Sequence, residues 1–75
     1  MFYVIELQTT TDESGAGILT SHKTRNEALS KYHNVLQYAA VSEVPVHAAV
    51  CVDEEGNLIA REAFDHRNKP VEAEA

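Results

Sequence analysis

The feature that most constrains this chain is a helix signal near its centre. Thr24 and Glu27 have the three-residue spacing of a capping box, in which each residue satisfies a free backbone N–H of the first turn. Behind the box, apolar residues recur on one 3.6-residue face: Ala28, Leu29, Tyr32, Leu36, Ala39 and Ala40. The pattern predicts a helix from about Arg25 to Val41. It ends before Pro45, because the residue preceding a proline resists the α-conformation.

The segments on either side of this helix favour strands. Phe2–Thr10 is rich in β-forming residues, and Ile18–Lys23 can return beside it across the turn-forming stretch Thr11–Gly17. After the helix, Val46–Val52 alternates between two faces, and Leu58–Phe64 follows it. We therefore expect a small α+β domain, with an antiparallel sheet of three or four strands in the order β(β)αββ and one helix packed on one face.

Length and composition restrict the class of protein. The chain has 75 residues and one cysteine, which is too short for an enzyme with a separate cofactor domain and excludes a disulfide scaffold. We expect one domain, residues 1–65, followed by a flexible C-terminal tail, residues 66–75, which is polar. No apolar run approaches the roughly 20 residues of a membrane-spanning helix. The N-terminus also lacks the basic segment of a signal peptide, which favours a cytoplasmic location.

The balance of apolar residues favours self-association. One helix can cover only one face of the sheet, and an exposed apolar face of this extent is unusual on a monomer. The residues expected on the uncovered face are Phe2, Val4, Ala49 and Cys51. Tyr38 and Val41 lie on a second helical stripe and fit an interface anchor, with packing at the edge of the core as the alternative.

A sparse set of basic and aromatic residues could bind a small anion. Twelve acidic against six basic residues give a net charge of −6, which argues against non-specific nucleic-acid binding but allows a local pocket for a small phosphorylated ligand. The candidate ligand-binding residues are Arg25, Arg61, His22, His47, Tyr32 and Tyr3. Isolated surface salt bridges are the simpler alternative for the charged ones.

The sequence contains no catalytic or metal-binding pattern. The four histidines have no zinc spacing, and His47 and Cys51 share a strand face at about 13 Å, too far for a nucleophile–base hydrogen bond. We expect Cys51 to be a small buried hydrophobe. Accordingly, we predict neither an enzyme nor a bound metal or cofactor.

The acidic residues offer a different kind of surface. A predicted hairpin loop, Asp53 to Asn57, carries Asp53, Glu54 and Glu55 and places Gly56 in the left-handed conformation. The loop lacks the spacing of a calcium-binding loop. Together with Glu62, its carboxylates could imitate the phosphate track of a nucleic acid and occupy a basic cleft on another protein. Ordinary solubility charge is the alternative.

Three segments carry a resemblance to other proteins. The strings FYVIELQT, EALSKYHNVLQYAAVSEVPVHAAV and VDEEGNLIARE look like those of short proteins, mostly without assigned function, from phages and prophages of gut bacteria. The resemblance covers Phe2 to about Arg61. It implies a host-defence inhibitor acting in the host cytoplasm, and it transfers no functional residue.

These observations lead to three functional hypotheses. The first is a non-enzymatic phage accessory protein that sequesters a small nucleotide-type signal in pockets between protomers of a homo-oligomer. The second is an acidic inhibitor that binds a host nucleic-acid-handling enzyme of the CRISPR type. The third is a structural or regulatory homodimer without a ligand.

Overall fold

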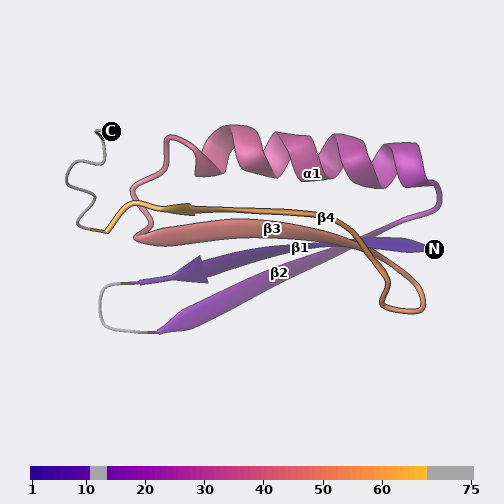
Figure 1. Ribbon diagram of the computed structural model, residues 1–75, viewed down its shortest axis with the longest axis horizontal. Coiled ribbons are helices and arrows are strands. Elements are labelled where there is room, and N and C mark those ends of the chain that lie inside the picture. The colour runs from indigo at the N-terminus through magenta and orange to yellow at the C-terminus, as the bar shows by residue number, and fades with distance from the viewer. Residues whose placement is uncertain (11–13, 68–75) are drawn as a thin grey trace.

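The computed structural model describes residues 1–10 and 14–67. In chain order its elements are β1 (Phe2–Thr9), β2 (Gly15–His22), α1 (Arg25–Ala39), β3 (Val46–Asp53) and β4 (Leu58–Asp65). The strands form one antiparallel sheet in the order β2-β1-β3-β4, and α1 lies along one side of it (Figure 1). The predicted α+β class, with one helix on an antiparallel sheet, is confirmed.

Strand β1 is central although it comes first in the chain. It pairs with β2 on one side and with β3 on the other, along its whole length in both cases. The β1–β2 and β3–β4 pairs are the two predicted hairpins, and Gly56 in the second loop has the expected left-handed backbone, with φ of +87°. The ladder between β3 and β4 is interrupted by a register shift at Cys51 and Val52.

Helix α1 begins at the predicted cap. The Thr24 Oγ1 accepts a hydrogen bond from the Glu27 N–H at 3.1 Å, the first of the two capping-box bonds. The helix ends at Ala39, two residues before the predicted Val41. The Ala40 N–H still bonds four residues back to Leu36, but the Val41 and Ser42 N–H groups bond only three residues back, to Tyr38 and Ala39, which tightens the last turn. Its buried residues are Ala28, Tyr32, Val35 and Ala39, so the stripe includes Val35, which we did not predict, and excludes the exposed Ala40.

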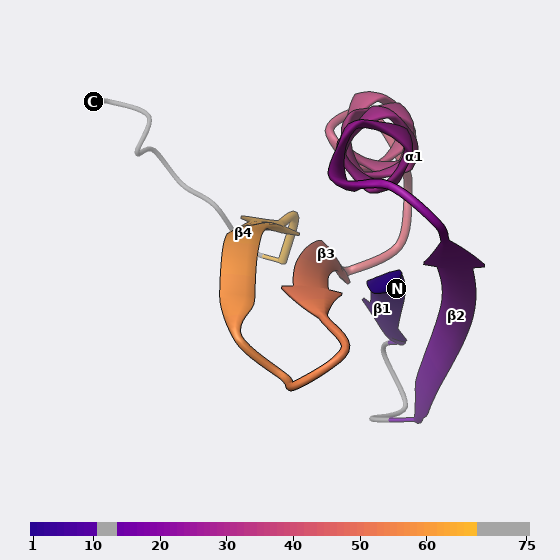
Figure 2. The ribbon, with the colours of Figure 1, turned by 90° about the vertical axis from the view of Figure 1, so that its right-hand side faces the viewer.

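The prediction of which sheet face the helix covers was wrong. Val4 is 1% exposed and Ala49 and Cys51 are fully buried beneath α1, while Phe2 packs against the same cluster. Small side chains on this face let the helix approach the sheet closely, with the large Tyr32 side chain filling the space between them. Val4 is therefore part of the core, and it is the other face that stays uncovered (Figure 2).

Two predicted boundaries also change. Gly15 to Gly17, assigned to the turn, belong to β2, which starts three residues earlier than predicted. Residues 11–13 of that turn and residues 68–75 of the predicted tail lie outside the described residues. His66, the first residue of the predicted tail, donates its backbone N–H to the Pro45 carbonyl at 2.7 Å. Within the described part of the chain, no helix is long and apolar enough to cross a membrane.

Candidate functional site

The largest candidate site is the uncovered face of the sheet. The strand registers place one residue from each strand in four rows across this face: Ser21, Tyr3, Val52 and Leu58; Leu19, Ile5, Val50 and Arg61; Gly17, Leu7, Ala48 and Ala63; and Gly15, Thr9, Val46 and Asp65. Figure 2 shows α1 on one side of the sheet, and the core residues Val4, Ala49 and Cys51 that pack against it alternate with the residues of these rows, which therefore face the other side. We call this surface the open face.

The open face is more apolar than the face beneath the helix. Its charged side chains, Arg61 and Asp65, both lie on the edge strand β4, so the two central strands present none. The covered face instead contains Glu6 and His47 on these central strands. Leu19 is 63% exposed at the β2 end of the open face. A sheet that leaves its more apolar side in water is unusual, and such a surface marks an interaction site.

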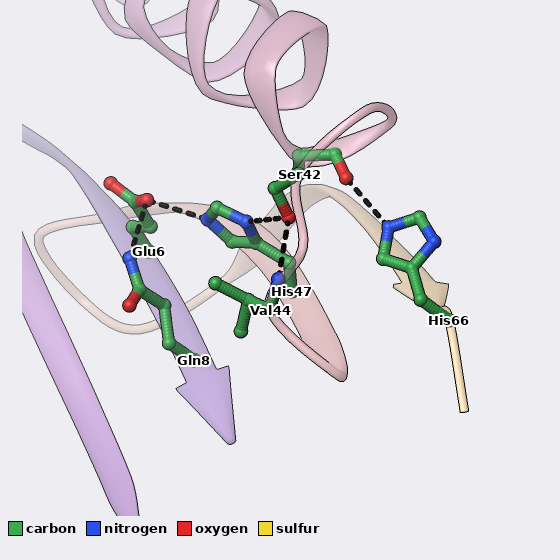
Figure 3. A network of polar contacts seen from close by, with 7 residues as sticks. Glu6, Gln8, Ser42, Val44, His47 and His66 are labelled. Atoms are coloured by element: carbon green, nitrogen blue, oxygen red, sulfur yellow. Dashed lines mark hydrogen bonds and ion pairs between the residues drawn. The ribbon is translucent and has the colours of Figure 1, made fainter. Parts of the chain in front are cut away.

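A polar network on the covered face ties the α1–β3 turn to the sheet (Figure 3). The Nε2 of His47 lies 2.6 Å from the Glu6 Oε2, and the Gln8 side-chain amide donates to the same oxygen at 3.0 Å. The His47 Nδ1 lies 2.9 Å from the Ser42 Oγ, which also accepts the Val44 N–H at 3.3 Å. The network thus links β1, β3 and the turn that joins the helix to β3.

The ionisation of Glu6 determines the direction of its hydrogen bond with His47. Burial raises its pKa, but hydrogen bonds from His47 and Gln8, with the nearby positive charges of His47 and Lys31, outweigh burial and leave the pKa below its usual value. The ionised carboxylate can only accept, so the His47 Nε2 carries a proton and donates it. The His47 Nδ1 and the Ser42 hydroxyl form the second hydrogen bond of the ring.

A hydroxyl, an imidazole and a carboxylate in series can activate a nucleophile, and the sequence did not reveal this arrangement. Here the Ser42 oxygen is already engaged by the Val44 N–H, and His47 is 4% exposed. The described residues also enclose no pocket for a substrate beside it. The geometry therefore supports a structural role, in which the buried imidazole has both nitrogens satisfied.

The candidate ligand-binding residues fall in three places within one protomer. Tyr32 and His47 are buried beneath α1, where burial raises the pKa of the Tyr32 hydroxyl. His22 and the exposed Arg25 flank the start of the helix, and the His22 Nε2 lies 3.0 Å from the Thr20 Oγ1. The remaining two, Tyr3 and Arg61, share the open face. One protomer does not bring the six residues together, so their binding role stays a prediction.

Two carboxylates of the acidic loop bind other groups of the same chain. The Asp53 carboxylate accepts the backbone N–H groups of Glu55 and Asn57 and the Asn57 side-chain amide, at 2.9 to 3.0 Å. The bonds from Asn57, followed by those from Glu55 and Gly56, lower the pKa of Asp53. Glu54 forms an ion pair with the N-terminal ammonium at 2.7 Å. A partner-binding role for Asp53, Glu54, Glu55 and Glu62 remains a prediction.

The remaining candidates are Tyr38, Val41 and Cys51. Tyr38 and Val41 are 63% and 80% exposed. Tyr38 lies on α1 away from its buried residues, whereas Val41 lies beyond the end of the helix and so forms no helical stripe with it; their interface role stays a prediction. Cys51 is buried as predicted, and burial raises the pKa of its thiol although Arg25 acts in the opposite direction. Its unreactive thiol form is thereby favoured. Among the described residues, no cluster of histidine, cysteine and acidic side chains could hold a metal ion.

Comparisons with known proteins add no family. No family model matches the chain, and neither a curated protein nor a solved structure matches it significantly. The candidate function therefore depends on the geometry alone, and the resemblance to phage proteins stays a prediction.

Of the residues on the open face, only Tyr3 and Arg61 were predicted to have a function, as ligand-binding residues. Ile5, Leu7, Leu19, Ala48 and Val50 were not named as interface residues, although the alternation that groups them is visible in the sequence. Glu6 was not predicted because its partner His47 lies 41 positions away and becomes its neighbour only through the pairing of β1 with β3. Ser42 lies five positions from His47, and their contact depends on the path of the turn between α1 and β3.

Proposed function

We propose that this chain is a non-enzymatic binding module that works as a homo-oligomer, with two copies joined through their open faces. The observation that carries the proposal is the reversed polarity of the sheet: its more apolar side is the one the helix leaves uncovered. Two such sheets packed face to face would form the missing half of each other's core, as in a β-sandwich.

The open face reaches the smallest area expected of a specific protein–protein interface. Four strands of eight residues each form the sheet. At about 4.8 Å between strands and about 3.3 Å per residue, the footprint is about 500 Å². Two facing footprints then cover about 1,000 Å², which is the lower range of specific interfaces.

The pattern of the open face is self-complementary. The rows through Tyr3 and Ile5 carry large side chains, whereas the row through Leu7 contains Gly17, Ala48 and Ala63. A two-fold axis running across the strands sets the large rows of one copy against the smaller rows of the other. The same axis brings Arg61 toward Asp65 of the partner subunit, so the charges at the edge of the face also match.

The test is the number of copies in solution, measured by native mass spectrometry and light scattering. We expect the wild type to be at least a dimer. Val50→Lys places a charge at the centre of the open face, and Leu7→Lys does so at a side chain already 43% exposed, so both should lose the face contact while keeping the fold. Gln37→Lys, on the exposed side of α1, is the matched control.

Two results would contradict the face contact. One is a wild-type protein that stays monomeric at the highest concentration measured. The other is an assembly that both open-face lysines leave intact. Circular dichroism of each variant separates loss of assembly from loss of fold.

A second candidate function is supported by the positions of Tyr3 and Arg61. Both lie on the open face, so a face-to-face dimer would bring a phenol and a guanidinium from each copy to its interface. These groups can stack on a base and bind a phosphate, which suits sequestration of a nucleotide-type ligand between protomers. Native mass spectra of freshly purified protein, before and after denaturation, test this function. Release of an ultraviolet-absorbing molecule from the wild type but not from Arg61→Ala supports it, and retention by Arg61→Ala argues against this site.

A further inference from the structure

The two edges of the sheet differ in how they are protected. Edge strand β4 carries Arg61, Glu62 and Asp65, and its ladder with β3 contains the register shift. Edge strand β2 reads GAGILTSH, with no acidic residue, lysine, arginine or proline, and its register with β1 is continuous. Charges, prolines and bulges are the usual devices that stop an edge strand from pairing with another chain. Strand β2 has none of the three.

The backbone groups that β2 presents outward can be assigned. The Thr10 N–H donates to the Ser14 carbonyl at 2.9 Å, which makes these two residues a hydrogen-bonded pair at the start of the ladder. Because such pairs alternate along an antiparallel ladder, Ile18 and Thr20 bond to β1, whereas Gly17 and Leu19 direct their N–H and C=O groups away from it. In the region that the structure describes, β2 is the last strand on this side, and α1 packs mainly over β1 and β3 (Figure 2).

We propose that β2 pairs with β2 of a second copy, antiparallel about a two-fold axis, to join two sheets into one of eight strands. This contact is separate from the face contact proposed above, and the two together assemble four copies. The contact also explains Ile18, which is 50% exposed on the helix side of the sheet, where the open-face dimer leaves it uncovered. A neighbouring β2 would flank both Ile18 and Leu19.

The occupant we propose is a second copy, because β2 is the edge at which two copies meet with the least repulsion and because it continues the open face. Each copy carries a net charge of −6, so two copies repel wherever acidic residues meet. Strand β2 is the edge that avoids this repulsion, since its side chains are uncharged apart from a titratable histidine at the end. Pairing through β2 also joins the open faces of the two copies at Leu19. The joined face offers a wider apolar surface for the face contact with a second pair of copies.

Gly17 offers a matched pair of variants. A side-chain carbon added there would lie 3.8 Å from the Leu7 Cδ2 and 3.9 Å from the Glu6 carbonyl oxygen, which are ordinary contacts. Gly17 also belongs to the open face, so a side chain at this position could affect the face contact. Gly17→Ala adds a side chain there but keeps the outward N–H, and it is therefore the control for that effect. Gly17→Pro removes that N–H while leaving the bonds to β1 in place, and proline is accepted on an edge strand whose N–H faces outward.

The experiment compares the assembly masses of the wild type, Gly17→Ala, Gly17→Pro and Val50→Lys by native mass spectrometry. We expect four copies for the wild type and Gly17→Ala, and half that mass for Gly17→Pro and for Val50→Lys. If the wild type and Gly17→Pro assemble to the same mass, the edge contact is wrong. If the wild type is a dimer that Val50→Lys disrupts and Gly17→Pro does not, the two copies meet through their open faces. If Gly17→Pro disrupts the dimer and Val50→Lys does not, the two copies meet through β2.

Amide hydrogen exchange gives a second readout that does not depend on mass. In the paired edge, the Gly17 and Leu19 amides of the wild type should exchange as slowly as those of Ile18 and Thr20, which bond to β1 in either case. In Gly17→Pro the Leu19 amide should become fast while Ile18 and Thr20 stay protected. A Leu19 amide that already exchanges fast in the wild type overturns the proposal.

Discussion

At the scale of single residues, Glu6 and His47 show how this chain places polar groups beneath a helix. The Glu6 carboxylate is 20% exposed, and its Oε2 accepts from both His47 and Gln8. Charge-assisted hydrogen bonds of this kind offset the free energy of burying the carboxylate only while it stays ionised. The network is therefore sensitive to acid.

Glu6→Gln should make the unfolding free energy less dependent on pH. The pKa of Glu6 is lower in the folded state, so its contribution is fully present above the ordinary value of 4.5 and is lost as the pH falls through the folded value. We expect the variant to be about 1 kcal/mol less stable at neutral pH, because a neutral amide accepts more weakly. The gap to the wild type should then narrow in acid.

Urea denaturation at a series of pH values measures this difference. Glu55→Gln, in the exposed hairpin loop, is the control and should follow the wild type. Parallel pH profiles for the wild type and Glu6→Gln would show that the network contributes no pH-dependent stability.

At the scale of elements, the start of α1 depends on one side chain. Thr24→Ala removes the oxygen that accepts the Glu27 N–H, and we expect a loss of about 1 kcal/mol in unfolding free energy. Thr24→Ser keeps the oxygen and should retain most of the stability. Equal urea midpoints for Thr24→Ala and the wild type would contradict a capping role.

The elements themselves could be predicted because their signals are local. The capping box at Thr24, the proline at position 45 and the loop around Gly56 each act within a few residues. The face covered by α1 could not be predicted, because both sets of alternating residues in β1 and β3 contain apolar residues and the covered set also contains Glu6 and His47. The choice depends on which set lets the helix approach closely, which is a property of the packed structure. The sequence likewise did not predict that β1 pairs with β3, so it did not predict the contact between Glu6 and His47.

At the scale of the whole molecule, charge and apolar surface are separated. The chain carries a net charge of −6, yet the central strands of the open face present no charge. The proposed association through this face would bring two acidic molecules together around an uncharged contact. The repulsion between them is long-ranged and is screened by salt, with a Debye length of about 10 Å at 0.1 M.

Raising the salt concentration should therefore tighten self-association. Analytical ultracentrifugation across a sodium chloride series measures the dissociation constant, which we expect to fall as the salt concentration rises. A dissociation constant that rises with salt would mean that attraction between opposite charges drives assembly. Binding of the acidic loop to a basic partner, as in the inhibitor hypothesis, should show that opposite dependence.

The central position of β1 also has a consequence for how the chain folds. β1 and β2 form one local hairpin, β3 and β4 form another, and the two meet only where β1 pairs with β3 across the helix. During synthesis the first strand leaves the ribosome long before its partner β3, and until then it has one unpaired side. Because closing a long loop is entropically costly, we expect the pairing of β1 with β3 to limit the folding rate. Core truncations at the β1–β3 seam, such as Val4→Ala, should therefore slow refolding in stopped-flow experiments, whereas Gly56→Ala in the local β3–β4 loop should mainly speed unfolding.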